Sequence, residues 1–410
     1  MILVLLAGLA LMNQARQEPL AAYDGAFADF LAMNSRHGAK PAPVVLVEIN
    51  ESSLADHAWP WTPLDFSLFF QATESLNPDV LAVDEVLDWN RLSLPDDQQR
   101  KLPQYEKILR DQILRAPKVL LGAQLGFPED PQVIPPLQEV PLLRNFKGSL
   151  NAVPEFTTLE RQPTENFRLS AVVGFTNLPP TQDRFNSVPL LFRYRGQLTP
   201  AFSLQAVMLW AKLTPDDIRV EIGSHIALGS QIRIPIDASG HMRVDFGSPR
   251  VEFGFDDLIL STEQAEAGRA TNAPINKIKG SIVLLSRTDS AAKTVPFAAR
   301  RNGSPGELFA SAIATIQNQS FIRRAPVWVD YIIVAAFVIV AYRIPRVKKL
   351  AAIGIGALSL TIYTLVALAA FSKWLVWLPA VAPLGMVAVF VLLRLVTPDS
   401  AGRPKRPVIF

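Results

Sequence analysis

The types and spacing of two adjacent residues, Asp84 and Glu85, suggest a pair of carboxylates that could take part in acid–base catalysis or bind a ligand. They lie within Val80–Val86, an apolar run that predicts a strand. Neighbouring side chains on a strand point to opposite faces, so we expect the pair not to share one substrate in acid–base catalysis. Asp84 is the better ligand-binding candidate, because α/β sheets bind ligands at the carboxyl ends of their strands. A cap of the following segment is an equally good interpretation.

A second group of candidates lies earlier in the chain, where Glu51, His57, Trp59 and Trp61 follow one another within a short stretch. Tryptophan rings can stack on a ligand, but the proline between these two indicates a rigid packed turn. Surface turns often collect such residues, so a solvated histidine is the better interpretation of His57. We therefore take Glu51, Trp59, Trp61 and Asp84 as the candidate ligand-binding residues.

The rest of the sequence offers no pattern for catalysis. Its four histidines show no metal-ligand spacing, and it contains no nucleophile elbow, P-loop or dinucleotide fingerprint. We therefore expect no metal site, no cofactor and no enzymatic activity.

Three apolar runs near the C-terminus, Val327–Tyr342, Leu350–Phe371 and Trp374–Val396, predict membrane spans. A span takes about 20 apolar residues, which the second and third runs supply, whereas the first is shorter and carries Asp330. The run Met1–Met12 is interpreted as an N-terminal anchor, with a buried helix as the alternative. The predicted organisation is an anchor at 1–18, an outer domain at 19–326, three transmembrane helices at 327–396 and a basic tail at 397–410.

Positive charge is concentrated beside these runs. The loop after the first run, together with the end of the third run and the tail after it, holds eight basic residues and one acidic residue, although the whole chain has a net charge of only +3. The large preceding region is therefore acidic, which argues against nucleic-acid binding. Basic segments favour the cytoplasmic side, so we expect an inner-membrane protein whose large domain lies in the periplasm or extracellular space. Arg323 and Arg324 run against this rule.

Apolar runs at Val44–Ile49, Val80–Val86 and Lys118–Leu125 predict buried strands, and Leu64–Leu76 has helical spacing. The resulting strand–helix–strand order predicts an α/β domain with a mixed, mainly parallel sheet. The other predicted strands are Ser170–Phe175, Val188–Arg195, Ser281–Ser286 and those within Ile218–Phe246, and the other helices are Pro19–Asn34, the second half of Arg91–Arg115, Pro200–Lys212, Asp256–Leu260 and Gly306–Gln319.

Short segments spread along the chain carry a resemblance to a known family. They are INESSL (49–54), WPW (59–61), VDEV (83–86), YRGQLTPAFSLQA (194–206), IDASGHMRVDF (236–246), KGSIVLL (279–285), PGELFA (305–310) and WLVWLPAVAP (374–383). In this order they resemble the type 2 CHASE domain, an extracellular sensory domain of bacterial membrane receptors. The family commonly has other residues at Asn50, Pro63, Ser286 and Phe309, so its ligand site is not transferred to this chain.

The resemblance implies a sensor that binds an unknown small-molecule ligand and is anchored in membrane lipid. Such receptors usually continue into a cytoplasmic output domain, and only about 16 residues follow Arg394 here. We therefore expect a signal to pass through Gly306–Gln319 and the spans to a separate protein partner that carries the output domain. The alternatives are an accessory subunit that docks a kinase or cyclase, and the input half of a split receptor. Small residues in the middle span fit either a homodimer or packing within one chain.

Overall fold

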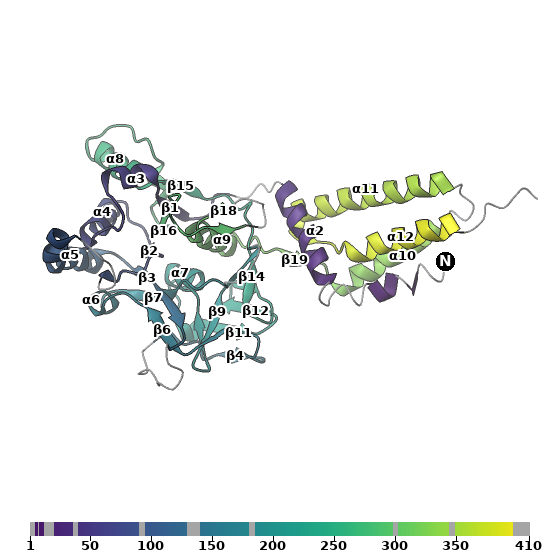
Figure 1. The fold of residues 1–410 in the computed structure, drawn as a ribbon, viewed down its shortest axis with the longest axis horizontal. Coiled ribbons are helices and arrows are strands. Elements are labelled where there is room, and N and C mark those ends of the chain that lie inside the picture. Colours follow the sequence, from purple (N-terminus) through teal and green to yellow (C-terminus); the bar gives the residue numbers. More distant parts are fainter. Residues whose placement is uncertain are drawn as a thin grey trace, which may run out of the picture. The chain divides into compact units, whose positions relative to one another are not determined.

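The computed structural model describes residues 5–6, 8–11, 20–35, 40–89, 95–128, 140–179, 185–297, 302–343 and 349–396. Its contacts divide the chain into two compact units, Gly38–Phe321 and the combination of Met1–His37 with Ile322–Phe410. We call them the α/β unit and the helical unit (Figure 1). Residues 20–35 and 322–326, which the sequence analysis assigned to the outer domain, pack with the helical unit.

A seven-stranded sheet forms the centre of the α/β unit. Its order is β15-β1-β16-β2-β3-β6, and β7 also pairs with β3. Every pair is parallel except β3 with β6, so the prediction of a mixed, mainly parallel sheet is confirmed. The strands are β1 (Val44–Ile49), β2 (Val80–Val83), β3 (Val119–Gly126), β6 (Thr158–Arg161), β7 (Val172–Phe175), β15 (Val251–Gly254) and β16 (Ile282–Arg287).

Helices cover both faces of this sheet, as the apolar strands require. Alternate residues of β1 enter different cores: Val44 and Leu46 pack with α7 and α9, whereas Val45 and Val47 pack with α4, α5 and α8. The helices of the unit are α3 (Glu51–Asp56), α4 (Pro63–Glu74), α5 (Asp96–Arg115), α6 (Glu165–Arg168), α7 (Phe202–Trp210), α8 (Phe255–Glu266) and α9 (Pro305–Gln317). The unit is therefore a three-layer helix–sheet–helix sandwich.

Smaller sheets complete the α/β unit. Their strands are β4 (Phe146–Lys147), β5 (Glu155–Phe156), β8 (Ser187–Pro189), β9 (Leu191–Tyr194), β10 (Gln197–Pro200), β11 (Ile218–Glu221), β12 (His225–Leu228), β13 (Ile232–Pro235), β14 (His241–Arg243), β17 (Val295–Pro296) and β18 (Asn302–Gly303). The predicted strand Val188–Arg195 is split in two, since β8 pairs with β14 and β9 with β10. Pro189, which has no backbone N–H, marks the break. The predicted helix Asp256–Leu260 is longer and continues to Glu266.

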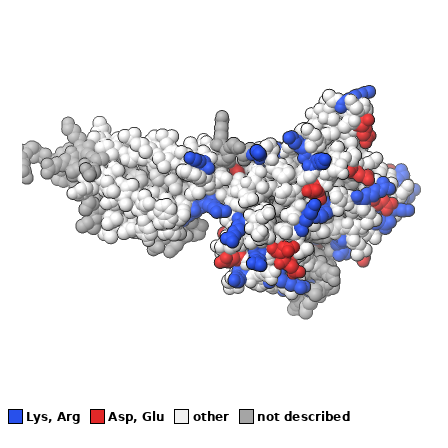
Figure 2. Space-filling view, turned by 180° about the vertical axis from the view of Figure 1, so that it is seen from behind, with Lys and Arg blue, Asp and Glu red and all other residues white. Residues whose placement is uncertain are grey.

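The helical unit contains α2 (Leu20–Asn34), α10 (Val327–Arg343), α11 (Lys349–Trp374) and α12 (Val381–Val396), with the strand pair β19 (Arg323–Arg324) and β20 (Val376–Trp377). On the face shown in Figure 2, charged side chains of both signs are scattered over the α/β unit, whereas most of the visible surface of the helical unit is uncharged. The helical residues 8–11 pack here too: Leu11 belongs to the apolar cluster that joins α10 and α12.

Among the described residues, α11 is the one helix long and apolar enough to cross a membrane. Val327–Val340 and α12 are apolar but shorter. The prediction of one helix over Trp374–Val396 is wrong in its first part, because β20 precedes Pro379 and α12 begins only at Val381. Within the unit, Gly356 of α11 packs against Val387 and Val391 of α12, so this small residue serves packing within the chain.

Candidate functional site

A cavity of about 180 Å³ lies at the carboxyl edge of the main sheet. Residues at the ends of β2, β16, β3 and β7 line it, together with Arg161 of β6 and the first turn of α9. The lining residues are Asp84, Glu85, Val86, Gln124, Arg161, Thr176, Leu178, Ser286, Arg287, Ala292, Lys293, Pro305 and Phe309. This is the edge at which α/β sheets bind ligands, and it is where the sequence placed Asp84.

The two carboxylate oxygens of Asp84 differ in their hydrogen bonding. The Ser286 hydroxyl donates to Asp84 Oδ2 at 2.8 Å. Asp84 Oδ1 is buried and has no hydrogen-bond partner among the described residues. Burial, and then the neighbouring Glu85 carboxylate, raise the pKa of Asp84 well above its ordinary value of 3.8. A buried acceptor without a donor is costly, so this oxygen marks a position where a ligand donor would be favourable.

Glu85 lines the same cavity as Asp84, so the prediction that the two carboxylates cannot serve one site is wrong. That prediction assumed a strand through Val86, whereas β2 ends at Val83. Gly122 of β3 lies beside this point: a Cβ on this residue would lie only 2.4 Å from the Asp84 carbonyl oxygen, so the Asp84 backbone occupies space that glycine leaves open. Beyond the strand, alternation no longer separates the two side chains. Burial raises the pKa of Glu85, an effect that Arg287 and Arg161 oppose.

Arg287, at the end of β16, connects the cavity to two of the predicted candidates. Its guanidinium carbon lies 4.4 Å from the centroid of the half-buried Trp59 ring, and its Nη2 donates to Asp289 Oδ2 at 2.9 Å. Burial alone would raise the pKa of Asp289, but the Arg287 bonds and the Ala291 N–H hold it below its ordinary value. Trp59 therefore positions a cation of the site and does not itself line the cavity.

Glu51 is exposed at the start of α3 and accepts a hydrogen bond from the Ser290 N–H at 2.7 Å. Backbone N–H groups of Glu51 and Ser290 lower the pKa of this carboxylate. Because Ser290 follows Asp289, this bond fixes the segment that continues to Ala292 and Lys293 at the cavity. Glu51 thus supports the site from outside and is not part of its lining.

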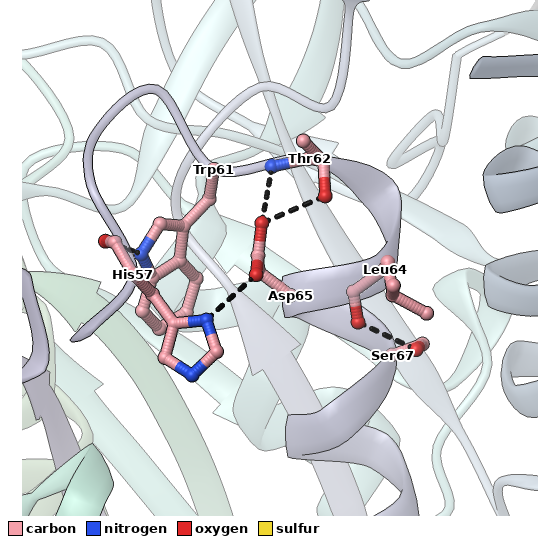
Figure 3. Close-up of polar contacts among 6 residues, drawn as sticks. All are labelled: His57, Trp61, Thr62, Leu64, Asp65 and Ser67. Atoms are coloured by element: carbon pink, nitrogen blue, oxygen red, sulfur yellow. Dashed lines mark hydrogen bonds and ion pairs between the residues drawn. The ribbon is translucent and has the colours of Figure 1, made fainter. Parts of the chain in front are cut away.

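Trp61 and His57 have structural roles (Figure 3). Trp61 is 1% exposed, its ring packs edge-on against Phe255, and its Nε1 donates to the His57 carbonyl at 2.8 Å. His57 Nδ1 lies 2.9 Å from Asp65 Oδ1, while the Thr62 N–H donates to Asp65 Oδ2 at 2.7 Å and caps α4. The interpretation of the tryptophan turn as packed is confirmed for Trp61. The interpretation of His57 as a lone solvated histidine is wrong, because Asp65 bonds it.

The first turn of α9 presses directly on the site. A Cβ on Gly306 would lie 2.0 Å from Ser286 Oγ and 3.1 Å from Asp84 Oδ2, so only glycine fits there. Ser304 caps the helix by accepting from the Glu307 N–H at 3.0 Å, and Pro305 occupies the first helical position. The α9 backbone at Gly306 is therefore in van der Waals contact with Ser286 and Asp84, which line the cavity. A displacement of the Asp84 carboxylate would act directly on the first turn of α9.

A wider groove of about 1050 Å³ lies over β4, β11, β12 and β13. It mixes acidic and basic side chains on an exposed surface, and its Glu221 already lies 3.5 Å from His225. It lies away from the carboxyl ends of the main sheet. We therefore take the smaller cavity as the functional site. Within the described residues, no group of three or more histidine, aspartate or glutamate side chains could hold a metal ion.

Six polar residues of the lining were not predicted as site residues: Gln124, Arg161, Thr176, Ser286, Arg287 and Lys293. Arg161 comes from β6, an antiparallel strand too short to give a clear pattern, and Gln124 interrupts the apolar β3. That interruption of a buried strand was the available signal, because a polar residue there needs a reason. The others reach the site only through long-range packing.

The raised pKa of Asp84 predicts a pH-dependent variant effect. A carboxyl whose pKa is raised on folding stabilises the protein below about pH 4, and that stability is lost as pH rises through the folded-state value. Asp84→Asn keeps the shape without the charge. We expect its Tm to match that of the wild type at pH 4 and to exceed it at pH 8. The increase should be about 2–4 °C for each kcal/mol of unfolding free energy that the wild type loses by ionising the buried carboxyl. Exposed Asp216→Asn is the control, and an Asp84→Asn difference that is equal at both pH values would contradict the burial argument.

Comparison with protein-family models matches residues 1–342 to the CHASE2 domain. Neither the curated proteins nor the solved structures contain a match to the chain. The matched residues include the whole α/β unit with the cavity. The resemblance drawn from the short segments is confirmed for the seven that lie within residues 1–342, and the segment at 374–383 lies outside the match.

Proposed function

Because the chain belongs to the CHASE2 domain family, whose members are extracellular sensor domains of membrane receptors, we propose that it is a membrane-anchored sensor that binds a small molecule in this cavity. The observation that carries the proposal is Asp84 Oδ1, which is buried in a cavity at the carboxyl edge of the sheet and has no hydrogen-bond partner in the part of the chain that the structure describes. Membership of a sensory family implies that the domain binds a ligand, and this oxygen is a position at which a ligand donor would be favourable.

The proposed signal route starts at the cavity and follows α9. Gly306 at the start of α9 contacts the site, and Gln317 at its end lies a few residues before Ile322, where the chain enters the helical unit. We propose that ligand binding shifts or stiffens α9 and so acts on α10, which passes the change to a separate partner with a cytoplasmic output domain. Such a shift needs only a difference in ligand affinity between two positions of the helix.

The proposed location is the inner membrane, with the α/β unit outside the cytoplasm and α10, α11 and α12 as spans. Its support is the basic loop and tail, the long apolar α11 and the extracellular location of the family. The sequence has no cysteine, so single cysteines report topology directly. A membrane-impermeant maleimide should label Ser224→Cys in intact spheroplasts and label Ser400→Cys only after permeabilisation; the opposite pattern would invert the orientation.

Ligand binding is tested on the full-length protein in detergent. A low-molecular-weight extract of the envelope of the expressing cells should raise the wild-type Tm, because a ligand that binds only the folded state stabilises it. Ala292→Trp places a large side chain at the cavity lining and should abolish the shift while leaving the protein folded. Exposed Ala267→Trp, outside the cavity, is the matched control and should retain the shift. An extract that shifts none of the proteins, or all three alike, would count against the site.

A further inference from the structure

The cavity also restricts what its ligand can be. An engineered cavity of about 150 Å³ binds benzene, so about 180 Å³ suits a molecule of roughly six to ten non-hydrogen atoms. Its lining is mainly polar, which argues against a lipid or an aromatic hydrocarbon. The ligand is thus a small polar molecule of about the size of an amino acid.

The basic side chains at the cavity indicate an anionic group on that molecule. Of the three, Arg287 is already held by Asp289 and stacked on Trp59. Within the described part of the chain, the Arg161 and Lys293 side chains line the cavity without a side-chain hydrogen bond or a salt bridge, and Arg161 acts on Glu85 only as a nearby charge. Guanidinium and ammonium groups bind carboxylates and phosphates with charge-assisted bonds, so these two cations can take an anion.

The acidic side of the cavity indicates a donor at the other end of the ligand. Asp84 Oδ2 accepts from Ser286 and is satisfied, whereas the buried Oδ1 has no donor within the described residues. A ligand hydroxyl or ammonium would satisfy it.

Resting on the proposed sensor function, we infer that the ligand is a small organic acid that carries a hydroxyl or ammonium group close to its carboxylate. The carboxylate binds Arg161 and Lys293, and the hydroxyl or ammonium donates to Asp84 Oδ1. Two features must therefore be present in one molecule, and either alone binds weakly.

Four defined probes separate these features on the full-length protein in detergent, with Kd measured by calorimetry. L-Glycerate and L-serine carry both groups and have the same configuration, so they differ only in a hydroxyl or an ammonium at C2; propionate carries only the carboxylate, and glycerol carries only donors. We expect glycerate or serine to bind at least about tenfold more tightly than propionate and glycerol, since each of the latter two lacks one of the two contacts. The better of the two identifies the donor as hydroxyl or ammonium.

Variants connect this binding to the named residues. Arg161→Gln and Lys293→Gln should each weaken the preferred probe about tenfold or more, and Arg161→Lys should recover part of the loss. Lys293 is exposed, so its variant tests the inference even if Arg161→Gln fails to fold. Asp84→Asn should weaken glycerate or serine and leave propionate unchanged. Lys147→Gln, on the exposed strand β4, is the control and should change nothing.

Three outcomes would overturn the inference. Propionate or inorganic phosphate binding as tightly as the preferred probe would show that the anion alone is recognised. Glycerol binding as tightly would show that the donor alone suffices. No binding by any probe, with an envelope extract that stabilises the wild type but not Ala292→Trp, would refute the ligand class and leave the sensor site standing; no response to either would refute both.

Discussion

Asp24→Ala is expected to destabilise the helical unit by about 3–5 kcal/mol, the usual effect of removing one partner of a buried ion pair. Asp24 is 1% exposed, and its Oδ2 lies 3.1 Å from the Arg324 guanidinium. Its Oδ1 accepts from the N–H groups of Ala380 and Val381 at 2.8 and 2.9 Å. One carboxylate of α2 thus binds the segment that precedes α10 and also caps the start of α12.

The measurement is the unfolding of the full-length protein in detergent, followed by the fluorescence of tryptophans in the helical unit. Asp24→Asn separates the two roles, because an amide oxygen still caps α12 but carries no charge for Arg324, so an intermediate loss is expected. The neighbouring Arg323→Ala removes an exposed cation of the same type and serves as the control. If Asp24→Ala costs no more than this control, the buried pair does not hold the unit together.

Gly306→Ala is expected to destabilise the α/β unit by about 3 kcal/mol. The new Cβ would lie 2.0 Å from Ser286 Oγ and 2.2 Å from Ser286 Cβ, and the buried strand β16 leaves Ser286 little freedom to move. Overpacking of this kind costs about 1–3 kcal/mol and occasionally more. The variant also moves the α9 backbone away from the Asp84 carboxylate, so we expect the affinity for the ligand to fall as well as the stability.

A double-mutant cycle tests this contact specifically. Ser286→Gly removes both atoms that the new Cβ would meet, at a cost of about 1 kcal/mol for the lost hydrogen bond to Asp84. In chemical denaturation, the double variant Gly306→Ala with Ser286→Gly should recover about 2 kcal/mol relative to the sum of the single variants. Additive losses would show that α9 does not press on Ser286.

The central strands β1, β2, β3 and β16 were predictable from the sequence because they are buried on both faces and read as apolar runs. The edge strands β6 and β15 are more exposed and more polar, and they were not predicted. The limits of those strands were less accessible. Asp84 and Glu85 line one site because β2 ends at Val83, and the path of the chain beyond it passes so close to Gly122 of a neighbouring strand that a side chain there would collide with Asp84. Contacts between strands that are distant in sequence carry no local signal, so the pair was assigned to opposite faces.

The candidate residues differ in the same way: their positions were predicted from local patterns, but their roles depend on contacts with distant segments. Asp84 was found because the edge of a parallel sheet is a general binding position. Glu51 and Trp59 were found as polar and aromatic neighbours, but they act through Ser290 and Arg287, which lie far along the chain. Arg324 contradicted the expected charge distribution, and the structure supplies the reason: Asp24 and Asp330, both 1% exposed, lie within 4 Å of its guanidinium. Its charge is therefore balanced inside the helical unit.

The central claim is that occupancy of the cavity at the carboxyl ends of β2 and β16 is transmitted to α9. Hydrogen exchange of Pro305–Gln317, measured on the full-length protein in lipid nanodiscs with and without the envelope extract, tests it most directly. The account predicts slower exchange in the first turn of α9 when the extract is present, and no slowing in Ala292→Trp. An extract that raises the Tm of the wild type while exchange in α9 stays unchanged would contradict it.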